Sequence, residues 1–192
     1  MESILSDGNT YTFWGDGVSQ GHSDAIRRIK GVKNAVQYTR PYTDAIEKVR
    51  NGERPTLSTR EKHYRECYVV LEENANKEEV ENSIINMPNY FTDYNTIVHF
   101  ISEEELKEKH LKMPHGGFVI RSGNTSTNTK QVVEYSLKLE SNPEFTASVL
   151  LSYARAACRL YEKGDRGCKT VLDIPPILLS EKQREDIIRE LL

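Results

Sequence analysis

Four polar residues of different chemistry stand at expected strand ends and corners of this sequence. Thr39 ends a strand, Arg65 lies inside one, His115 stands between a proline and two glycines, and Asn142 precedes a long helical segment. A hydroxyl, a guanidinium, an imidazole and an amide together suit a carboxylate, because the arginine fork can donate to both carboxylate oxygens. The set therefore predicts a carboxylate-binding site.

Each of these residues also has a structural explanation. Thr39 fits a strand interior, and Arg65 fits a solvated or cross-strand pair. His115 fits a hydrogen bond within its turn, and Asn142 fits a helix N-cap. Taken singly, none defines a site. The sequence also contains no GxGxxG after a strand, no Walker loop, no HExxH and no GxSxG, so no complete catalytic constellation is visible.

The stretch Gly8–Arg40 would hold such a site in place. Gly15, Gly17 and Gly21 follow one another closely beside the only tryptophan, Trp14. Glycine permits positive φ and close approach, so this spacing indicates a backbone that makes room for a ligand. A tight β–α turn with Trp14 as core filler explains the same spacing, and both interpretations stay open.

The rest of the chain alternates strand and helix patterns, which predicts an α/β (α+β) fold with an open mixed β-sheet covered by helices. We expect a domain at 1–142 and C-terminal helices at 143–192. Pro143–Lys163 is apolar around most of its circumference, which predicts a helix buried on more than one side. The expected strands are Thr10–Trp14, Val32–Thr39, Lys62–Leu71, Tyr94–Ile101, Phe118–Arg121, Gln131–Leu139 and Lys169–Leu172. The expected helices are Ala25–Lys30, Tyr42–Arg50, Lys77–Met87, Ser102–His110, Pro143–Lys163 and one that begins at Ser180; a polar loop is expected at Glu53–Arg60.

Composition narrows the class of protein. The chain has 192 residues and a net charge of −3, which disfavours nucleic acid and anionic membranes as partners. No apolar run reaches the length of a membrane span. Cys67, Cys158 and Cys168 lack metal-type spacing and are expected to be reduced thiols of a cytoplasmic protein. For Cys158 and Cys168 we expect buried, inert thiols in preference to redox-active ones.

Several segments closely resemble meso-diaminopimelate dehydrogenase over essentially the whole chain. They are TYTFWG, GVSQGHSDAIRRIKGVKNAVQYT, STREKHYREC, MPNYF, VHFISEEEL, MPHGGFVIRSG and SLKLESNPEFTASVL. The resemblance implies an NADP-dependent oxidative deamination of the D-centre of meso-2,6-diaminoheptanedioate, giving L-2-amino-6-oxoheptanedioate and ammonia. The reverse reaction would supply lysine and peptidoglycan precursors.

The resemblance also implies roles for particular residues. Trp14 would lie beside the substrate, with Gln20 and Gly21 on the same wall. The amino-acid end remote from the nicotinamide would be held by Thr39, Arg65, His115 and Asn142. Asn142 is in addition a candidate cofactor contact on the nicotinamide side. The implied partners are meso-diaminopimelate, a second copy in a homodimer and a separate nucleotide-binding half.

The sequence departs from the family in one respect. It has no counterpart of the family's N-terminal dinucleotide-binding half or of its Trp-Asp-Pro-Gly stretch, and Met1–Leu5 looks like the end of a helix. We therefore expect the substrate-binding and dimerisation part of the enzyme, with no complete catalytic set and with C-terminal helices that pack against an absent nucleotide-binding domain. The alternative is a non-catalytic binding or dimerisation module.

Overall fold

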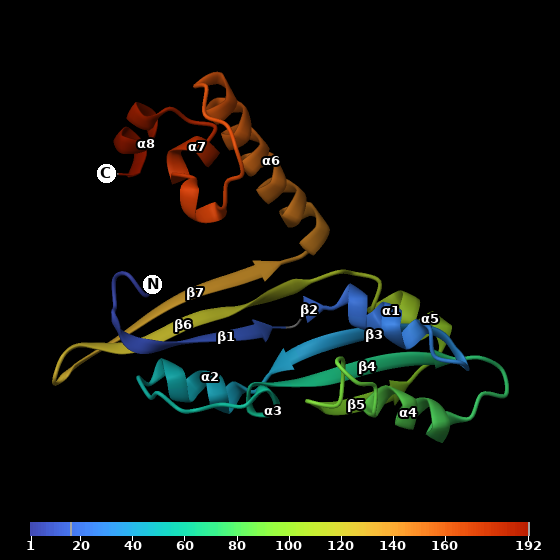
Figure 1. The fold of residues 1–192 in the computed structure, drawn as a ribbon. Helices are drawn as coiled ribbons and strands as arrows, with labels where there is room; N and C mark the ends of the chain where they lie inside the picture. The colour runs from blue at the N-terminus through green and yellow to red at the C-terminus, as the bar shows by residue number, and fades with distance from the viewer. Residues whose placement is uncertain (16, 192) are drawn as a thin grey trace. The chain divides into compact units, whose positions relative to one another are not determined.

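A computed structural model describes residues 1–15 and 17–191. They form two compact units, Met1–Ser141 and Asn142–Leu192 (Figure 1). The first unit mixes strands and helices, and the described part of the second is helical. The predicted α/β class with open mixed sheet and helices is confirmed. The strands form two open sheets instead of one, because the chain passes from one sheet to the other between Gly15 and Gly17.

The first sheet is antiparallel, in the order β1-β6-β7. Its strands are β1 (Asp7–Gly15), β6 (His115–Ser126) and β7 (Thr129–Leu139). Tyr11 and Phe13 of β1 lie opposite Ile120 and Phe118 of β6. Alternation places these four apolar side chains on one face, where they pack against the helix α2 (Thr43–Arg50).

The second sheet has the order β2-β3-β4-β5. Its strands are β2 (Gly17–Val18), β3 (Val32–Pro41), β4 (His63–Leu71) and β5 (Asn95–Phe100). β4 and β5 run parallel and are joined through the helix α4 (Lys77–Ile85), whereas the other pairs are antiparallel. As predicted, Arg65 and Cys67 point to one face of β4, and Tyr64, Glu66 and Tyr68 to the other.

Two helices cover the Arg65 face of this sheet. Ile26 of α1 (Gln20–Arg27) and Ile84 of α4 are fully buried against Cys67 and Val69. Truncating such a side chain to alanine typically costs about 2–5 kcal/mol. The Ser23 hydroxyl accepts the Gln37 backbone N–H at 2.9 Å and so fixes α1 relative to β3. This face is therefore rigidly built next to Arg65.

Two short helices do not match the predictions: one lies where a loop was expected, and the other is shorter than expected. The segment Glu53–Arg60 was predicted to be a polar loop, but the helix α3 (Thr59–Lys62) begins within it. Ser58 and Glu61 form a capping box there, which stabilises even a single turn. The helix α5 (Glu103–Lys109) follows Ser102, whose Oγ accepts the Glu105 N–H at 3.1 Å. Met1–Leu5 contains a turn closed by the Leu5 N–H on the Met1 carbonyl.

The second unit begins with α6 (Asn142–Glu162), one residue earlier than predicted. The predicted burial of α6 on several sides is wrong for this chain, since Leu150 and Leu151 are mostly exposed. The predicted strand Lys169–Leu172 is also wrong. A 3₁₀ turn, η1 (Val171–Asp173), stands there because Thr170 and Asp173 form a local capping box. The remaining helices are α7 (Pro176–Leu179) and α8 (Arg184–Leu191), and α8 begins four residues after the predicted Ser180.

Candidate carboxylate-binding site

Arg65 is buried without an acidic partner. Only 7% of the residue is exposed. Its Nη1 donates to Thr39 Oγ1, and its guanidinium lies 3.8 Å from the centroid of the Tyr94 ring. Among residues 1–15 and 17–191 no ion pair to Arg65 is found. Burial lowers the pKa of Arg65 from its usual value, yet a guanidinium stays charged near neutral pH. A buried cation paired only with neutral groups indicates an anionic ligand.

The hydroxyl of Thr39 is oriented by two donors. Thr39 lies directly opposite Arg65 in the β3–β4 pair. Its Oγ1 accepts from Arg65 Nη1 and, at 3.4 Å, from Gln37 Nε2. A hydroxyl has two acceptor lone pairs and one proton to donate. With both lone pairs engaged, the Thr39 proton is available to a carboxylate oxygen.

Thr39, Arg65 and their neighbours on the adjacent strands form a row across the second sheet. Buried polar atoms without a hydrogen-bond partner gather along this row. Four of the five such atoms among the described residues are Gln37 Oε1, Arg65 Nε, Thr96 Oγ1 and His115 Nδ1, and the fifth, Ser122 Oγ, lies in the first sheet. Thr96 of β5 is the direct neighbour of Arg65 on the side away from Thr39. Each buried polar group left unsatisfied costs about 1–3 kcal/mol, so such groups are rare in native structures. Their concentration in one place favours a polar ligand as the missing partner.

Trp14 and His115 form the other side of the row. Their rings stack with centroids 6.0 Å apart and an interplanar angle of 21°, and Trp14 is 53% exposed. Gly17 pairs with Thr39, and a Cβ atom at Gly17 would overlap His115 Nδ1. Gly17 therefore fits the interpretation that a glycine permits close approach, because the missing Cβ leaves room for the His115 ring.

The remaining predicted site residues lie farther from this row or in the other unit. Gln20 is exposed at the start of α1, and its Nε2 donates to the Met113 sulfur at 2.9 Å. Gly21 is exposed, with open space around its Cα. Asn142 is the first residue of α6 in the second unit. The first unit therefore brings Thr39 and Arg65 into contact, and likewise Trp14 and His115.

Nearby histidines and cysteine add no charge to the site near neutral pH. Burial, aided by the charge of Arg65, lowers the pKa of His22 to about 4. Burial, with Lys62 and Arg65, lowers that of His63 to about 4 as well. Burial raises the pKa of the Cys67 thiol to about 12. Arg65 therefore sets a positive charge here among neutral groups.

Four neighbours of the site were not singled out from the sequence: Gln37, His63, Tyr94 and Thr96. Gln37 and His63 could have been found, because the period of two places them on the faces of Thr39 and Arg65. Thr96 and Tyr94 depend on the parallel register of β4 and β5, which no local pattern encodes.

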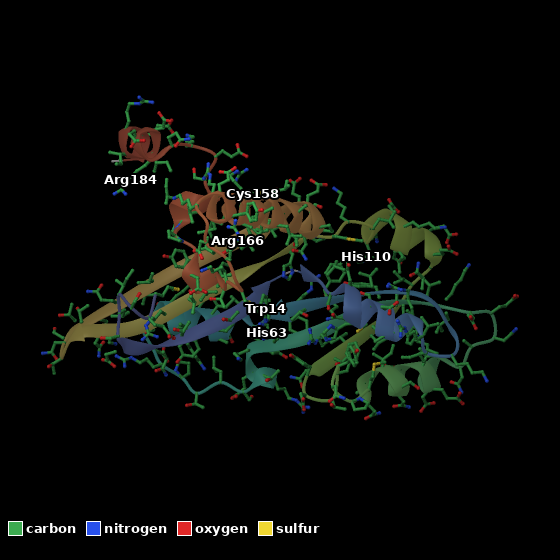
Figure 2. The ribbon with its side chains drawn as sticks, turned by 45° about the horizontal axis from the view of Figure 1, so that its top comes forward. Trp14, His63, His110, Cys158, Arg166 and Arg184 are labelled. Carbon is green, nitrogen blue, oxygen red and sulfur yellow. The ribbon has the colours of Figure 1, made fainter. Side chains whose placement is uncertain are left out.

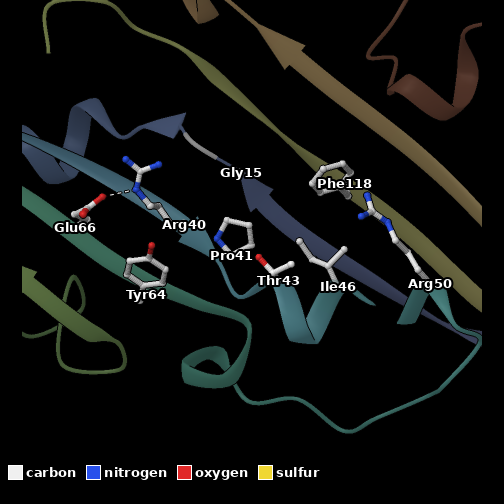
Figure 3. Close-up of a pocket in the computed structure, with 9 residues that line it drawn as sticks. All are labelled: Gly15, Arg40, Pro41, Thr43, Ile46, Arg50, Tyr64, Glu66 and Phe118. Carbon is white, nitrogen blue, oxygen red and sulfur yellow. Dashed lines mark hydrogen bonds and ion pairs between the residues drawn. The ribbon is translucent and has the colours of Figure 1, made fainter. Parts of the chain in front are cut away.

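A separate groove lies on the opposite face of the second sheet (Figure 3). It has a volume of about 570 Å³, and Ile46 and Phe118 contribute apolar side chains to it. Its charged groups are already paired: Arg40 with Glu66, and Arg50 with Glu134. We place the candidate ligand site at Arg65 because unsatisfied polar groups, and not the volume of a groove, favour a polar ligand.

No cluster of histidine, cysteine and acidic residues suited to a metal is found in the described part of the chain. Cys158 and Cys168 are exposed free thiols, so their predicted burial is wrong, whereas the free thiol of Cys67 is buried. None of the described helices has the length and hydropathy needed to cross a membrane. The described residues do not fit the phosphates of a dinucleotide, because Gly17 lies within β2 and no glycine-rich loop of the described part joins a strand directly to a helix N-terminus.

Solved structures of amino-acid dehydrogenases share this fold. A meso-dapdh variant from Clostridium tetani E88, solved with DAP, matches with a TM-score of 0.92 and 57% identity, covering 100% of this chain and 59% of that one. The C. glutamicum DAP dehydrogenase in complex with DAP gives 0.90 and 46%, with the same coverage. An engineered D-amino acid dehydrogenase bound to NADP+ gives 0.83 and 43%, again covering 100% and 59%.

The chain belongs to the family described as diaminopimelic acid dehydrogenase C-terminal domain, which matches residues 1–141. It is 66% identical over 191 residues to the meso-diaminopimelate D-dehydrogenase of Ureibacillus thermosphaericus, covering 100% of this chain and 59% of that protein. It is 47% identical over 186 residues to that of Corynebacterium glutamicum, covering 97% and 58%. The chain thus spans less than two thirds of these relatives.

Proposed function

We propose that this chain is the substrate-binding and dimerisation part of an NADP-dependent meso-diaminopimelate D-dehydrogenase of the cytoplasm. The observation that carries the proposal is the buried Arg65 guanidinium, which has no acidic partner in the described residues. Meso-2,6-diaminoheptanedioate carries a carboxylate at each end. The carboxylate remote from the reacting carbon would accept from Arg65 and from the Thr39 hydroxyl.

The neighbouring groups give this contact its specificity. His115 Nδ1 and Thr96 Oγ1 are buried and unsatisfied beside the row, and each would pair with the amino-acid end of the substrate. A ligand without that end leaves these groups unpaired, and a site of this kind rejects such analogues strongly. Trp14 would form an apolar wall for the aliphatic chain, together with Gln20 and Gly21.

The Clostridium tetani variant solved with DAP supports this assignment. Its six substituted residues have the same types, order and separations along the chain as Gln20, Thr39, Arg65, Pro114, His115 and Asn142 of this sequence. Asn142, the first residue of α6, is a further candidate contact to the substrate and to the cofactor.

A bound nicotinamide would supply the redox chemistry by which the D-centre is oxidised. NADP would be held outside the described residues, in a nucleotide-binding half on the same or a separate chain. The residues of this chain would hold and orient the remote end of the substrate, and such positioning can contribute several kcal/mol to catalysis. The product would serve the synthesis of lysine and peptidoglycan precursors.

Two chains would associate as a homodimer through the first unit. Apolar side chains of β7 support this, since Tyr135 and Leu137 are exposed on one face of the strand. A monomer by light scattering at micromolar concentration would contradict the dimer. A non-catalytic binding or dimerisation module is the alternative function.

The test of the proposed function is calorimetric titration of the 192-residue chain with meso-diaminopimelate. We expect one site per chain, strongly weakened in Arg65→Lys and retained in the control Arg28→Lys, whose side chain is exposed at the C-cap of α1. Activity assays with NADP, alone and with a separately expressed nucleotide-binding half, separate the two functions. Turnover only after complementation supports the enzyme, and none in either case supports the binding module.

A further inference from the structure

A side chain outside the predicted set holds the backbone of Trp14. The Trp14 N–H donates to His63 Nε2 at 2.8 Å, and the two residues lie next to each other in Figure 2. Trp14 belongs to β1 of the first sheet and His63 begins β4 of the second. This hydrogen bond therefore connects the two sheets at the place where the chain crosses between them.

The His63 ring is fixed in this position. Its residue is 4% exposed, and its ring lies 6.2 Å from that of Phe13. His63 is the C-cap of α3, and its backbone N–H donates to the carbonyl of Thr59, the first residue of that helix. The capped turn therefore sets where β4 starts. Because Nε2 accepts a backbone N–H, the imidazole is neutral with its proton on Nδ1. A neutral, buried ring is a stable acceptor at neutral pH.

The Trp14 ring has few other restraints. It is 53% exposed and stacks on His115. The residues of β6 that pair with this part of β1 are glycines: Trp14 pairs with Gly117, and Gly15 pairs with Gly116. Glycine provides no side chain to pack against the indole. The position of the ring thus depends on the backbone at Trp14, which His63 holds.

We propose that His63 is a positioning residue of the binding site, which sets the Trp14 ring against His115 by accepting the Trp14 backbone N–H. The role of His63 in substrate binding rests on the proposed function, but its effect on the Trp14 ring does not. If His63 were only a core histidine, its replacement would lower stability and leave the Trp14 ring unchanged.

The first experiment uses the fluorescence of Trp14, the only tryptophan in the chain. His63→Leu removes the acceptor, and His63→Gln retains an oxygen that can accept. In folded protein, judged by circular dichroism, we expect acrylamide quenching of Trp14 to rise about twofold in His63→Leu and to return toward the unmodified value in His63→Gln. The control is His110→Gln, on the opposite face against Tyr68.

Equal quenching in folded His63→Leu and the unmodified chain would overturn the proposal. If His63→Leu does not fold, amide hydrogen exchange of Trp14 in the unmodified chain decides instead. Protection comparable to the β1–β6 ladder supports the bond, and exchange at the rate of an open loop contradicts it.

The second experiment measures binding of meso-diaminopimelate. We expect the dissociation constant to rise at least fivefold in His63→Leu and to recover partly in His63→Gln. An unchanged constant with altered quenching would overturn the role in the site. If the unmodified chain binds no meso-diaminopimelate, the proposed function fails, whereas the quenching result still decides whether His63 positions Trp14.

Discussion

The two faces of the second sheet each carry an arginine, and the two arginines differ in their partners. On one face Arg40 is paired with Glu66, and its guanidinium lies over the Tyr38 ring. On the other face Arg65 donates to Thr39 and lies over the Tyr94 ring, with no acidic partner described. An arginine that is paired with an acidic side chain needs no anionic ligand to balance its charge, and we assign it a structural role. A charge balanced only by neutral groups is complete only with a ligand, and this difference identifies the site better than the position of the groove.

The largest expected effect separates these two arginines. Arg65→Lys should weaken meso-diaminopimelate binding about 10- to 150-fold, because lysine loses the planar fork and charged hydrogen bonds contribute about 1.5–3 kcal/mol. Arg40→Lys should change the same dissociation constant less than threefold. Calorimetric titration of both variants checks the prediction, and equal losses of affinity would remove the distinction between the faces.

The next effect concerns stability on the paired face. Glu66→Gln removes one charge partner of Arg40 and the negative charge that faces His99, whose Nε2 lies 3.3 Å from Glu66 Oε1. We expect a loss of about 1–3 kcal/mol in the free energy of unfolding, measured by urea denaturation, with unchanged ligand affinity. Weaker ligand binding in a folded Glu66→Gln chain would show that the faces are coupled.

A smaller effect follows from the site histidines. Folding lowers the pKa of His63 from about 6.5 to about 4, so the unfolded chain takes up the proton first as pH falls. The contribution of His63 to stability should therefore be complete above about pH 6.5 and be lost as pH falls from about 6.5 to about 4, with a slope that approaches roughly 1.4 kcal/mol per unit inside this window. His22 adds to the slope in the same window. Urea titrations at several pH values should give a shallower slope for His63→Gln, and an identical slope would contradict the neutral ring.

The smallest effect is expected at Gly21. Its Cα borders open space within the helix α1, so an added methyl group meets nothing in the ligand-free chain. Gly21→Ala should raise the free energy of unfolding by about 0.5–1 kcal/mol, since alanine is the better helix former. If Gly21 lines the substrate wall, the same change should weaken binding of meso-diaminopimelate. Unchanged affinity would remove Gly21 from the wall.

The sequence predicted those parts of the fold that depend on local periodicity. The alternation along β4 correctly separated Arg65 and Cys67 from Tyr64, Glu66 and Tyr68. The split into two sheets was not predictable, because β1 pairs with β6 about a hundred residues away and local patterns carry no such pairing. The strand expected at Lys169–Leu172 failed because the Thr170 and Asp173 side chains bond the backbone locally.

The same limit applies to the candidate site. Residue chemistry suggested a carboxylate site that includes Thr39 and Arg65, but their contact depends on the β3–β4 register. The position of His63 depends on a four-residue helix that the polar composition of Glu53–Arg60 concealed. The roles of Thr39, Arg65 and His63 in ligand binding stay predictions.

The crossing of the chain between sheets has a consequence for cooperativity. The first unit contains two hydrophobic clusters without a common residue, one built on Phe13 and Ile120 and the other on Cys67 and Val69. The row of unsatisfied groups lies where these clusters adjoin, near the hydrogen bond between Trp14 and His63. Two cores joined through such a junction can open separately. A ligand that bridges β4 and β6 would make them unfold together, so the cooperativity of unfolding would rise with the concentration of that metabolite.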